Sequence, residues 1–268
     1  MIALLGGPFV SKAYVAQAEA INITGTENLL EAARTAGCQR FIYTSSVDTC
    51  FAGKPLPQMD ETLPYPKSFK SVYARTKAEA ERTVLAANGS GGLYTCAIRP
   101  DGIWGAESND MIDRIARQIR RGQMSRRIGS PDTLQDNSHV LNLVHAHLLA
   151  AGRLGEGGVA SGKAYFISDG EPQNAIEFFR PLIEGLGKPM PEKQLSTGML
   201  RVVAHIMQAA HFLFGAAKPP LSPHELDKVT VTHYAVNTLA ERELGYQPVI
   251  SYAEGMEQCL AYVLSQGD

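Results

Sequence analysis

The sequence has little of what several protein classes require. Its four cysteines, Cys38, Cys50, Cys96 and Cys259, form neither a CxxC pair nor a Cys/His cluster with metal-ligand spacing. We therefore expect free thiols in a reducing compartment and no bound metal. There is no run of about 20 apolar residues, so no membrane-spanning helix is expected. The formal net charge of −2 argues against a nucleic-acid partner.

The N-terminal sequence also lacks the features of a secretory signal. MIALLGGPFVSKAYVAQ has neither a basic segment nor a long apolar segment, and we interpret it as part of the fold. Together with the free thiols, this predicts a cytoplasmic protein. A hydrophobic content of 44% and a charged content of 19% are typical of a globular chain.

Strand-like and helix-like segments alternate along the chain. Buried strands are expected at 39–46, 93–100 and 163–170. Helices are expected at 13–37, 73–88, 109–121, 138–153, 174–186, 196–215, 236–244 and 252–265. This alternation predicts an α/β fold, with a parallel sheet and crossover helices.

Ligands of such folds bind beyond the carboxyl ends of the strands. That edge would carry Ser45 and Ser46 after the first visible strand, Arg99 and Pro100 at the end of the next, and Ser168 at the third. A serine at a strand end is also a common way to satisfy backbone groups in a turn. The position alone therefore leaves both roles open.

The segment SFKSVYARTKAEAER (68–82) places Tyr73 and Lys77 four residues apart. On a helix they share one face, and an ammonium beside a phenol lowers the pKa of the phenol. The pair is then one way to build a general base, although most such pairs are ordinary surface neighbours. With Ser46 nearby, Tyr73 would take a proton from a secondary alcohol, while Ser46 would bind the developing carbonyl oxygen.

Several further segments resemble one known family. They are NITGTENLLEAA (22–33), RFIYTSS (40–46), YARTK (73–77), AIRPDGIWG (97–105), GKAYFISDGEP (162–172) and ELGYQPVISYAEGM (243–256). In this order they resemble the extended short-chain dehydrogenase/reductase superfamily. The resemblance is narrower to its 3β-hydroxysteroid dehydrogenase branch, which includes sterol-4α-carboxylate 3-dehydrogenases.

The resemblance implies a Rossmann-like, doubly wound parallel sheet and a smaller, mostly helical substrate lobe. The NAD(P)-binding domain would comprise 1–104 and about 138–170, and the lobe 105–137 and 171–268. It implies Ser46, Tyr73 and Lys77 as the catalytic triad, with Ser45 as a stand-in for Ser46. The groups near the NAD or NADP cofactor would be Asn22, Ser45, Tyr73, Lys77, Pro100, Gly102 and Ile103.

The sequence departs from this family at its start. Gly6 and Gly7 are not followed by the third glycine of a GxxGxxG turn, which holds the pyrophosphate at a helix N-terminus. We therefore expect a chain that lacks the first strands of the family's sheet, through truncation or a mis-assigned start. The helix from residue 13 would then leave Val15, Ala18, Ile21 and Leu29 partly uncovered, and the first strand would have an open edge.

The substrate side depends on the helix at 196–215. Its Arg201, His205, Gln208 and His211 lie on one side and the rest is apolar. One interpretation is a core helix with a solvated stripe, and the other is a lid or a membrane-surface helix for a sterol-like substrate. The resemblance favours the second. It also implies a homodimer through the helices at 13–36 and 73–88.

Three functions remain open from the sequence. The first is NAD(P)-dependent oxidation of a steroid 3β-hydroxyl group, or reduction of the 3-keto group. The second stays within the superfamily, as a nucleotide-sugar epimerase or dehydratase or a long-chain β-keto acid reductase. The third is an inactive fragment, because the glycine-rich turn is absent from the sequence.

Overall fold

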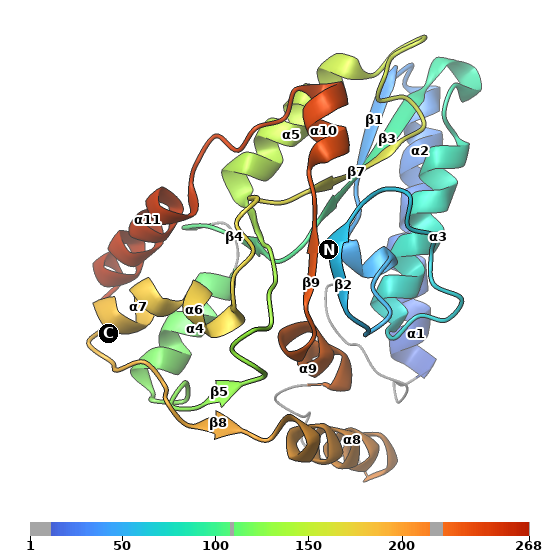
Figure 1. Ribbon diagram of the computed structural model, residues 1–268. Coiled ribbons are helices and arrows are strands. Elements are labelled where there is room, and N and C mark those ends of the chain that lie inside the picture. Colours follow the sequence, from blue (N-terminus) through green and yellow to red (C-terminus); the bar gives the residue numbers. More distant parts are fainter. Residues whose placement is uncertain (1–11, 108–109, 215–221, 268) are drawn as a thin grey trace.

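A three-stranded parallel sheet with helices on both faces forms one core of the molecule (Figure 1). The computed structural model describes residues 12–107, 110–214 and 222–267. Strands β1 (Arg40–Thr44), β3 (Tyr94–Pro100) and β7 (Ala164–Ile167) lie in the order β1-β3-β7. Both pairings are parallel, as the alternation of strands and helices predicts. The carboxyl ends of the three strands therefore share one edge.

The two faces of the sheet carry different helices. One face is covered by α2 (Gly25–Thr35) and α3 (Val72–Ala86), the other by α5 (Val140–Arg153) and α10 (Thr238–Leu244). Neighbouring side chains of β3 point to opposite faces, so Ile98 packs with α5 and α10 while Ala97 packs with α2 and α3. Both faces of β3 are buried, so its residues from Thr95 to Pro100 are buried without alternation.

The expected N-terminal helix has an irregular centre. It runs as α1 (Lys12–Glu19), a π-helical turn η1 (Ala20–Thr24) and α2. Such π-turns occur mostly within α-helices and often at functional positions. Gly37 follows α2 with a φ of 69°, which a glycine adopts at little cost and which ends the helix.

The remaining helices form a second, smaller core around Trp104. It contains α4 (Asp110–Arg120), α6 (Ala175–Phe178), α7 (Arg180–Gly185) and α11 (Tyr252–Ser265). The expected helix at 174–186 is thus two short helices, and α8 (Thr197–Phe214) and α9 (Pro223–Thr230) follow.

The short elements that the sequence did not predict are α9, η2 (Val47–Thr49), η3 (Ser90–Gly92) and three parallel strand pairs. The pairs are β2 (Leu56–Met59) with β9 (His233–Ala235), β4 (Ile103–Trp104) with β6 (Ser138–His139), and β5 (Arg127–Ile128) with β8 (Gln194–Leu195).

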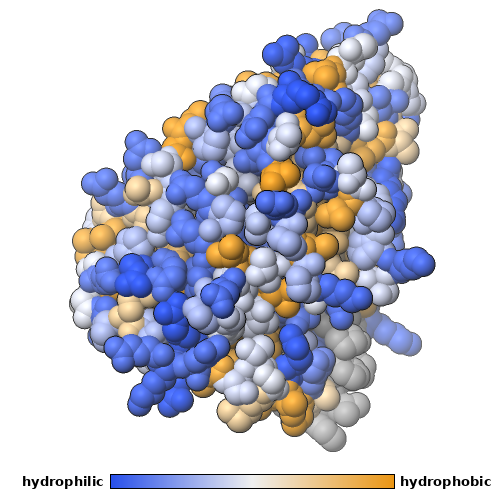
Figure 2. Space-filling view, viewed as in Figure 1, coloured by the Kyte–Doolittle hydropathy of each residue, from blue (hydrophilic) through white to orange (hydrophobic). Residues whose placement is uncertain are grey.

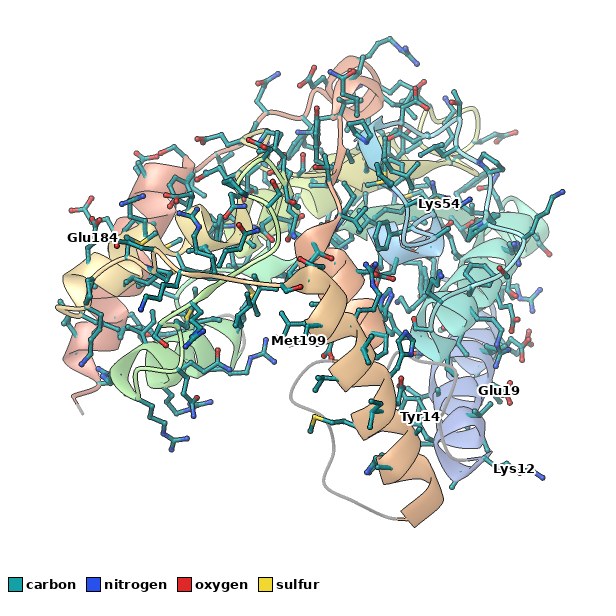
Figure 3. The ribbon with its side chains drawn as sticks, turned by 60° about the horizontal axis from the view of Figure 1, so that its bottom comes forward. Lys12, Tyr14, Glu19, Lys54, Glu184 and Met199 are labelled. Carbon is teal, nitrogen blue, oxygen red and sulfur yellow. The ribbon has the colours of Figure 1, made fainter. Side chains whose placement is uncertain are left out.

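Helix α8 exposes both polar and large apolar side chains. Arg201, His205 and His211 are exposed, as the expected solvated stripe requires, whereas Gln208 is buried one turn after the buried Ala204, contrary to expectation. The exposed large apolar side chains are Met199, Val202, Val203 and Ile206. Figure 2 shows orange atoms at the bottom of the molecule over α8, and Figure 3 shows Met199 on this helix. No helix in the described part of the chain is long and apolar enough to cross a membrane.

The faces expected to be uncovered are partly so. Ile21 and Leu29 are 40% and 61% exposed, whereas Ala18 is buried, contrary to expectation. Among the described residues, β1 pairs with β3 alone and its other edge is open, as expected. A second exposed apolar row, Leu141, Val144 and Leu148, lies on α5, which contacts β1. The truncation itself stays a prediction.

A buried ion pair joins the sheet to α3. The Arg99 guanidinium of β3 donates two hydrogen bonds from Nε and one from Nη2, at 2.6–3.2 Å, to the Glu81 carboxylate of α3. Both side chains are almost fully buried. Tyr65 donates to the same carboxylate. The arginine holds the pKa of Glu81 below its usual range despite the desolvation that raises it.

We expect Arg99→Met to destabilise the protein by about 3–5 kcal/mol, because Glu81 would stay buried without its partner. The control is Arg34→Met, which removes an exposed pair with Glu31 and should change the stability little. Urea unfolding of both variants measures the difference. Equal stabilities for the two variants would contradict a structural role for the buried pair.

Candidate active site

Ser46 and Tyr73 meet at the carboxyl edge of the sheet. After β1 the chain turns into η2, where the extended backbone of Ser46 lets its Oγ accept a hydrogen bond from the Asp48 backbone N–H at 3.2 Å. Tyr73 is the second residue of α3, whose N-cap Ser71 accepts from the backbone N–H of Ala74. The Ser46 hydroxyl lies close enough to the Tyr73 phenol to lower its pKa. The structure therefore brings two of the three predicted catalytic groups near each other.

Lys77 lies one helical turn after Tyr73 and is anchored to the strand. Its Nζ donates a hydrogen bond to the Thr44 carbonyl oxygen at 2.6 Å and lies 4.1 Å from the centre of the Tyr43 ring. Desolvation lowers the pKa of Lys77 to about 8, while Glu81 opposes this shift. The ammonium thus stands at the carboxyl end of β1, in a site that is costly for a charge.

The pKa of Tyr73 is raised, not lowered as the Tyr/Lys spacing predicts. Desolvation raises it to about 12, and the negative charge of Asp48 acts in the same direction. The nearby Ser46 hydroxyl and the Lys228 charge lower it. The prediction fails because the Lys77 ammonium is turned to the Thr44 carbonyl group, and the spacing of two residues on a helix does not fix where a long side chain ends.

Asn22 supports the helix that carries Tyr73. It lies in the π-helical turn η1 and its Nδ2 donates to Thr76 Oγ1 at 2.9 Å. Thr76 Oγ1 in turn donates to the Tyr73 carbonyl oxygen at 3.1 Å. Asn22 is buried in this chain of contacts. Its side chain therefore acts on the first turn of α3, which agrees with the architectural role that the resemblance implies.

Ser45 does not share the environment of Ser46. Its backbone N–H donates to the Ile98 carbonyl oxygen, and its buried hydroxyl lies near Glu81, whose pKa it helps to lower. Adjacent residues of extended backbone point to opposite sides, so only one of the two hydroxyls can face Tyr73. The structure selects Ser46.

The turn after β3 lies at the same edge. Pro100 ends the strand, and Gly102 separates it from β4, which begins with Ile103. A Cβ atom on Gly102 would lie 2.4 Å from Asn137 Oδ1, so a larger residue here would have to displace the Asn137 side chain. The three predicted cofactor-side residues are therefore held in a tight turn beside the end of β1.

Sequence reasoning missed a charged cluster next to this site. It consists of Asp48 after β1, Asp101 after β3, Lys228 and His224 on α9, and His233 on β9. The two aspartates follow strand ends, as Ser46 and Pro100 do, and that signal was available in the sequence. Nothing in the sequence marks Lys228, which reaches the site only through the fold.

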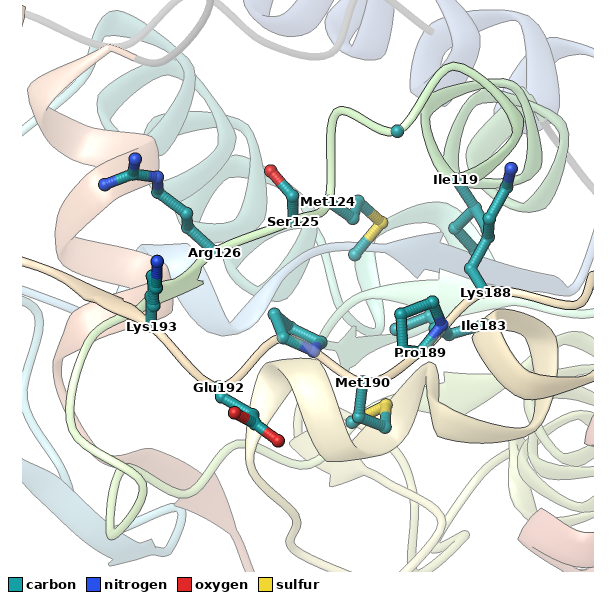
Figure 4. A pocket seen from close by; sticks show the side chains of 12 residues that line it. Ile119, Met124, Ser125, Arg126, Ile183, Lys188, Pro189, Met190, Glu192 and Lys193 are labelled. Atoms are coloured by element: carbon teal, nitrogen blue, oxygen red, sulfur yellow. The ribbon is translucent and has the colours of Figure 1, made fainter.

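A surface hollow of about 550 Å³ lies elsewhere, in the smaller lobe (Figure 4). It lies between the end of α4 and the segment after α7, and the side chains around it include Ile119, Met124, Ile183 and Met190. Neither Ser46 nor Tyr73 lines it. Within the described ranges, no group of three His, Cys, Asp or Glu side chains is placed to hold a metal ion.

Comparison with known families decides the assignment. The model of the 3-beta hydroxysteroid dehydrogenase/isomerase family matches residues 7–197. The chain belongs to this family. It is 41% identical over 265 residues to the 3 beta-hydroxysteroid dehydrogenase/Delta 5-->4-isomerase of Mycobacterium tuberculosis, covering 99% of this chain and 72% of the relative. The 3-beta-hydroxysteroid dehydrogenase of Mycolicibacterium neoaurum is 38% identical, with coverages of 98% and 72%.

This chain is also similar to the human short-chain dehydrogenase/reductase family 42E member 1. It is 40% identical over 240 residues, which cover 85% of this chain and 61% of that protein. Family membership confirms the predicted recognition and the prediction of an oxidoreductase of this class.

Solved structures confirm the Rossmann-like fold of this family member. The UDP-glucose 4-epimerase of Thermotoga maritima has a TM-score of 0.72 at 19% identity, covering 100% of this chain and 77% of that one. RMD of Pseudomonas aeruginosa, solved with NADPH, has a TM-score of 0.66 at 23% identity, with coverages of 98% and 80%. At these identities the likeness concerns the fold alone.

We expect one lysine to titrate near pH 8, well below the ordinary value of about 10.4, because Lys77 is desolvated at the end of β1. NMR of the lysine ε-carbons as a function of pH measures this. The low-pH titration should disappear in Lys77→Met and persist in Lys163→Met, a variant of a surface ion pair. If no lysine titrates below pH 9.5 in the unmodified protein, the described position of Lys77 is wrong.

Proposed function

We propose that this chain is an NAD(P)-dependent oxidoreductase that acts on the 3β-hydroxyl or 3-keto group of a steroid-like substrate. The observation that carries the proposal is the placement of Ser46 and Tyr73 near each other at the end of β1, with Lys77 anchored to the Thr44 carbonyl group of the same strand. This constellation stands at the carboxyl edge of a parallel sheet, where such folds bind ligands. Two bacterial relatives named for this activity share 41% and 38% of the aligned residues.

The side chains would divide the chemistry of alcohol oxidation. Tyr73 Oη would take the hydroxyl proton, and Ser46 Oγ would donate a hydrogen bond to the oxygen as it becomes a carbonyl. Lys77 would hold its positive charge at the strand end and contact the cofactor ribose. When bound, the oxidised nicotinamide accepts the hydride, and its positive charge favours the tyrosinate. In the opposite direction Tyr73 would protonate a ketone.

The described residues fit the nicotinamide end of the cofactor better than its pyrophosphate end. Ser46, Lys77 and the turn at 100–103 lie together at the sheet edge. In the part of the chain that the structure describes, no glycine-rich turn follows a strand and opens a helix, which is the usual pyrophosphate site. The choice between NAD and NADP therefore stays open within the proposal.

Two exposed apolar faces support the expected partners. The α8 face of Met199, Val202, Val203 and Ile206 suits a lid or a membrane-surface contact for an apolar substrate. On the other side, Ile21 and Leu29 lie on the helices through which a homodimer is expected. We propose both the α8 contact with an apolar substrate or a membrane surface and the homodimer contact.

We expect Tyr73→Phe to lower the turnover of a 3β-hydroxysteroid by about 100- to 10,000-fold, because the general base is lost. Absorbance of the reduced nicotinamide measures the rate. The matched control is Tyr94→Phe, at the opposite end of β3, which should keep nearly full activity. Full turnover by the Tyr73 variant would refute the mechanism.

We expect calorimetric titration to show binding of a nicotinamide cofactor, and binding of a 3β-hydroxysteroid to the complex that forms. UDP-glucose should not displace the steroid, because the exposed Met199, Val202, Val203 and Ile206 of α8 suit an apolar substrate. Displacement by UDP-glucose, without any steroid binding, would favour an epimerase. A chain that binds the steroid but no cofactor at millimolar concentration would be a lipid-binding remnant and not a dehydrogenase.

A further inference from the structure

A single ammonium connects three segments around the candidate active site. Lys228 Nζ, from α9, donates hydrogen bonds to Asp48 Oδ1 at 2.9 Å and to Asp101 Oδ1 at 2.5 Å. The aspartates follow β1 and β3, and they lie 180 and 127 residues before Lys228 in the sequence. Both carboxylates are at least nine-tenths buried, and the Lys228 side chain is only 22% exposed. This geometry joins the helical lobe to the functional edge of the sheet.

Each aspartate is in turn bonded to a residue of the site. The Asp48 backbone N–H donates to Ser46 Oγ at 3.2 Å. Asp101 Oδ1, the same oxygen that Lys228 contacts, accepts a hydrogen bond from the Gly102 backbone N–H at 2.9 Å. The Lys228 ammonium is therefore linked to the Ser46 hydroxyl through Asp48, and to the predicted nicotinamide turn through Asp101.

The outer oxygens of the two carboxylates face histidines. His224 Nε2 lies 3.4 Å from Asp48 Oδ2, and His233 Nε2 lies 3.2 Å from Asp101 Oδ2. The ring of Phe51 stacks against His233, with 4.6 Å between the ring centres. These aromatic groups restrict access of water, so the ammonium and the carboxylates interact where screening is weak.

The cluster has more negative charge than Lys228 can neutralise alone. Two ionised carboxylates would repel each other if the ammonium were absent, and they stand on the two segments that must stay at a fixed separation. The attraction of Lys228 to both is thus a force that draws the Ser46 segment and the Gly102 turn toward the same helix. An apolar side chain at this position would provide no such force.

We propose that Lys228 is a positioning residue, which fixes Ser46 and the turn at 101–103 relative to each other and to the substrate lobe. This inference rests on the proposed oxidoreductase function. Lys228 does not react with substrate, and it acts through Asp48 and Asp101. Lys228 lies on α9, and a capping box between Ser222 and Glu225 fixes the N-terminal end of this helix.

The experiment compares steady-state kinetics of Lys228→Met, Lys228→Arg and the control Lys163→Met. Lys228→Met should lower kcat by about 100-fold, the cost of a displacement of about 1 Å near the chemistry. Lys228→Arg, which keeps the charge and can bond both carboxylates, should recover at least part of the loss. Lys163, which pairs with Glu243 at the surface, should be dispensable.

Loss of Lys228 leaves two buried carboxylates without their shared ammonium, and that variant can fail to fold. The triple variant Asp48→Asn, Asp101→Asn, Lys228→Met removes the repulsion and should regain thermal stability. The proposal predicts that kcat stays about 100-fold low in this stable variant, because nothing draws the two segments together. Recovery of both stability and kcat would overturn it.

Hydrogen exchange separates this proposal from the proposed function. In the triple variant, the backbone amides at 46–50 and 101–103 should exchange at least about 10-fold faster, while those of β3 at 95–98 stay protected. If the unmodified chain oxidises no steroid but the exchange changes as expected, the positioning role of Lys228 is right and the proposed function is wrong. Unchanged exchange in both segments would refute the positioning role of Lys228, whatever the activity.

Discussion

The buried ion pair between Arg99 and Glu81 is the interaction on which the site depends. It fixes α3 against β3, and α3 carries both Tyr73 and Lys77. With Glu81 held one turn after Lys77, the lysine can reach the Thr44 carbonyl group at the end of β1. The same carboxylate accepts a hydrogen bond from Tyr65 and lies near Ser45. The segments that carry these two residues therefore meet at Glu81. A buried pair of this kind specifies one arrangement, because each partner left alone would be a costly buried charge.

Charge is distributed unequally around the Tyr73 hydroxyl. Lys77 is turned toward the strand, whereas Asp48, Asp101, Lys228 and the nearby Ser46 hydroxyl act on the phenol. Desolvation raises the pKa of Tyr73 most, the two carboxylates raise it further, and the Lys228 ammonium lowers it. Distant parts of the chain contribute these charges, because Lys228 comes from α9 and the aspartates from the sheet edge.

The fold could be predicted from the sequence to a large extent. The three central strands and most helices were expected within a few residues of their observed bounds, because long amphipathic or apolar segments have strong local patterns. The two-residue strands could not be predicted, since segments such as Arg127–Ile128 are strands only because a distant segment pairs with them. The place of Gln208 in the polar stripe of α8 was wrong for a similar reason. Periodicity shows that a helix has two faces, but the neighbours decide that Gln208 is buried and Val202 exposed.

The sequence by itself determined the order of strands and helices and the residues at the functional edge. These follow from local patterns and from the fact that parallel strands end on the same side. The sequence also contained the Ser46, Tyr73 and Lys77 set. Only the tertiary structure decided which serine faces Tyr73, where the Lys77 ammonium is anchored, and that Lys228 joins Asp48 to Asp101. The physical reason is that long-range contacts depend on burial and on the ends of flexible side chains, and residue spacing along the chain encodes neither.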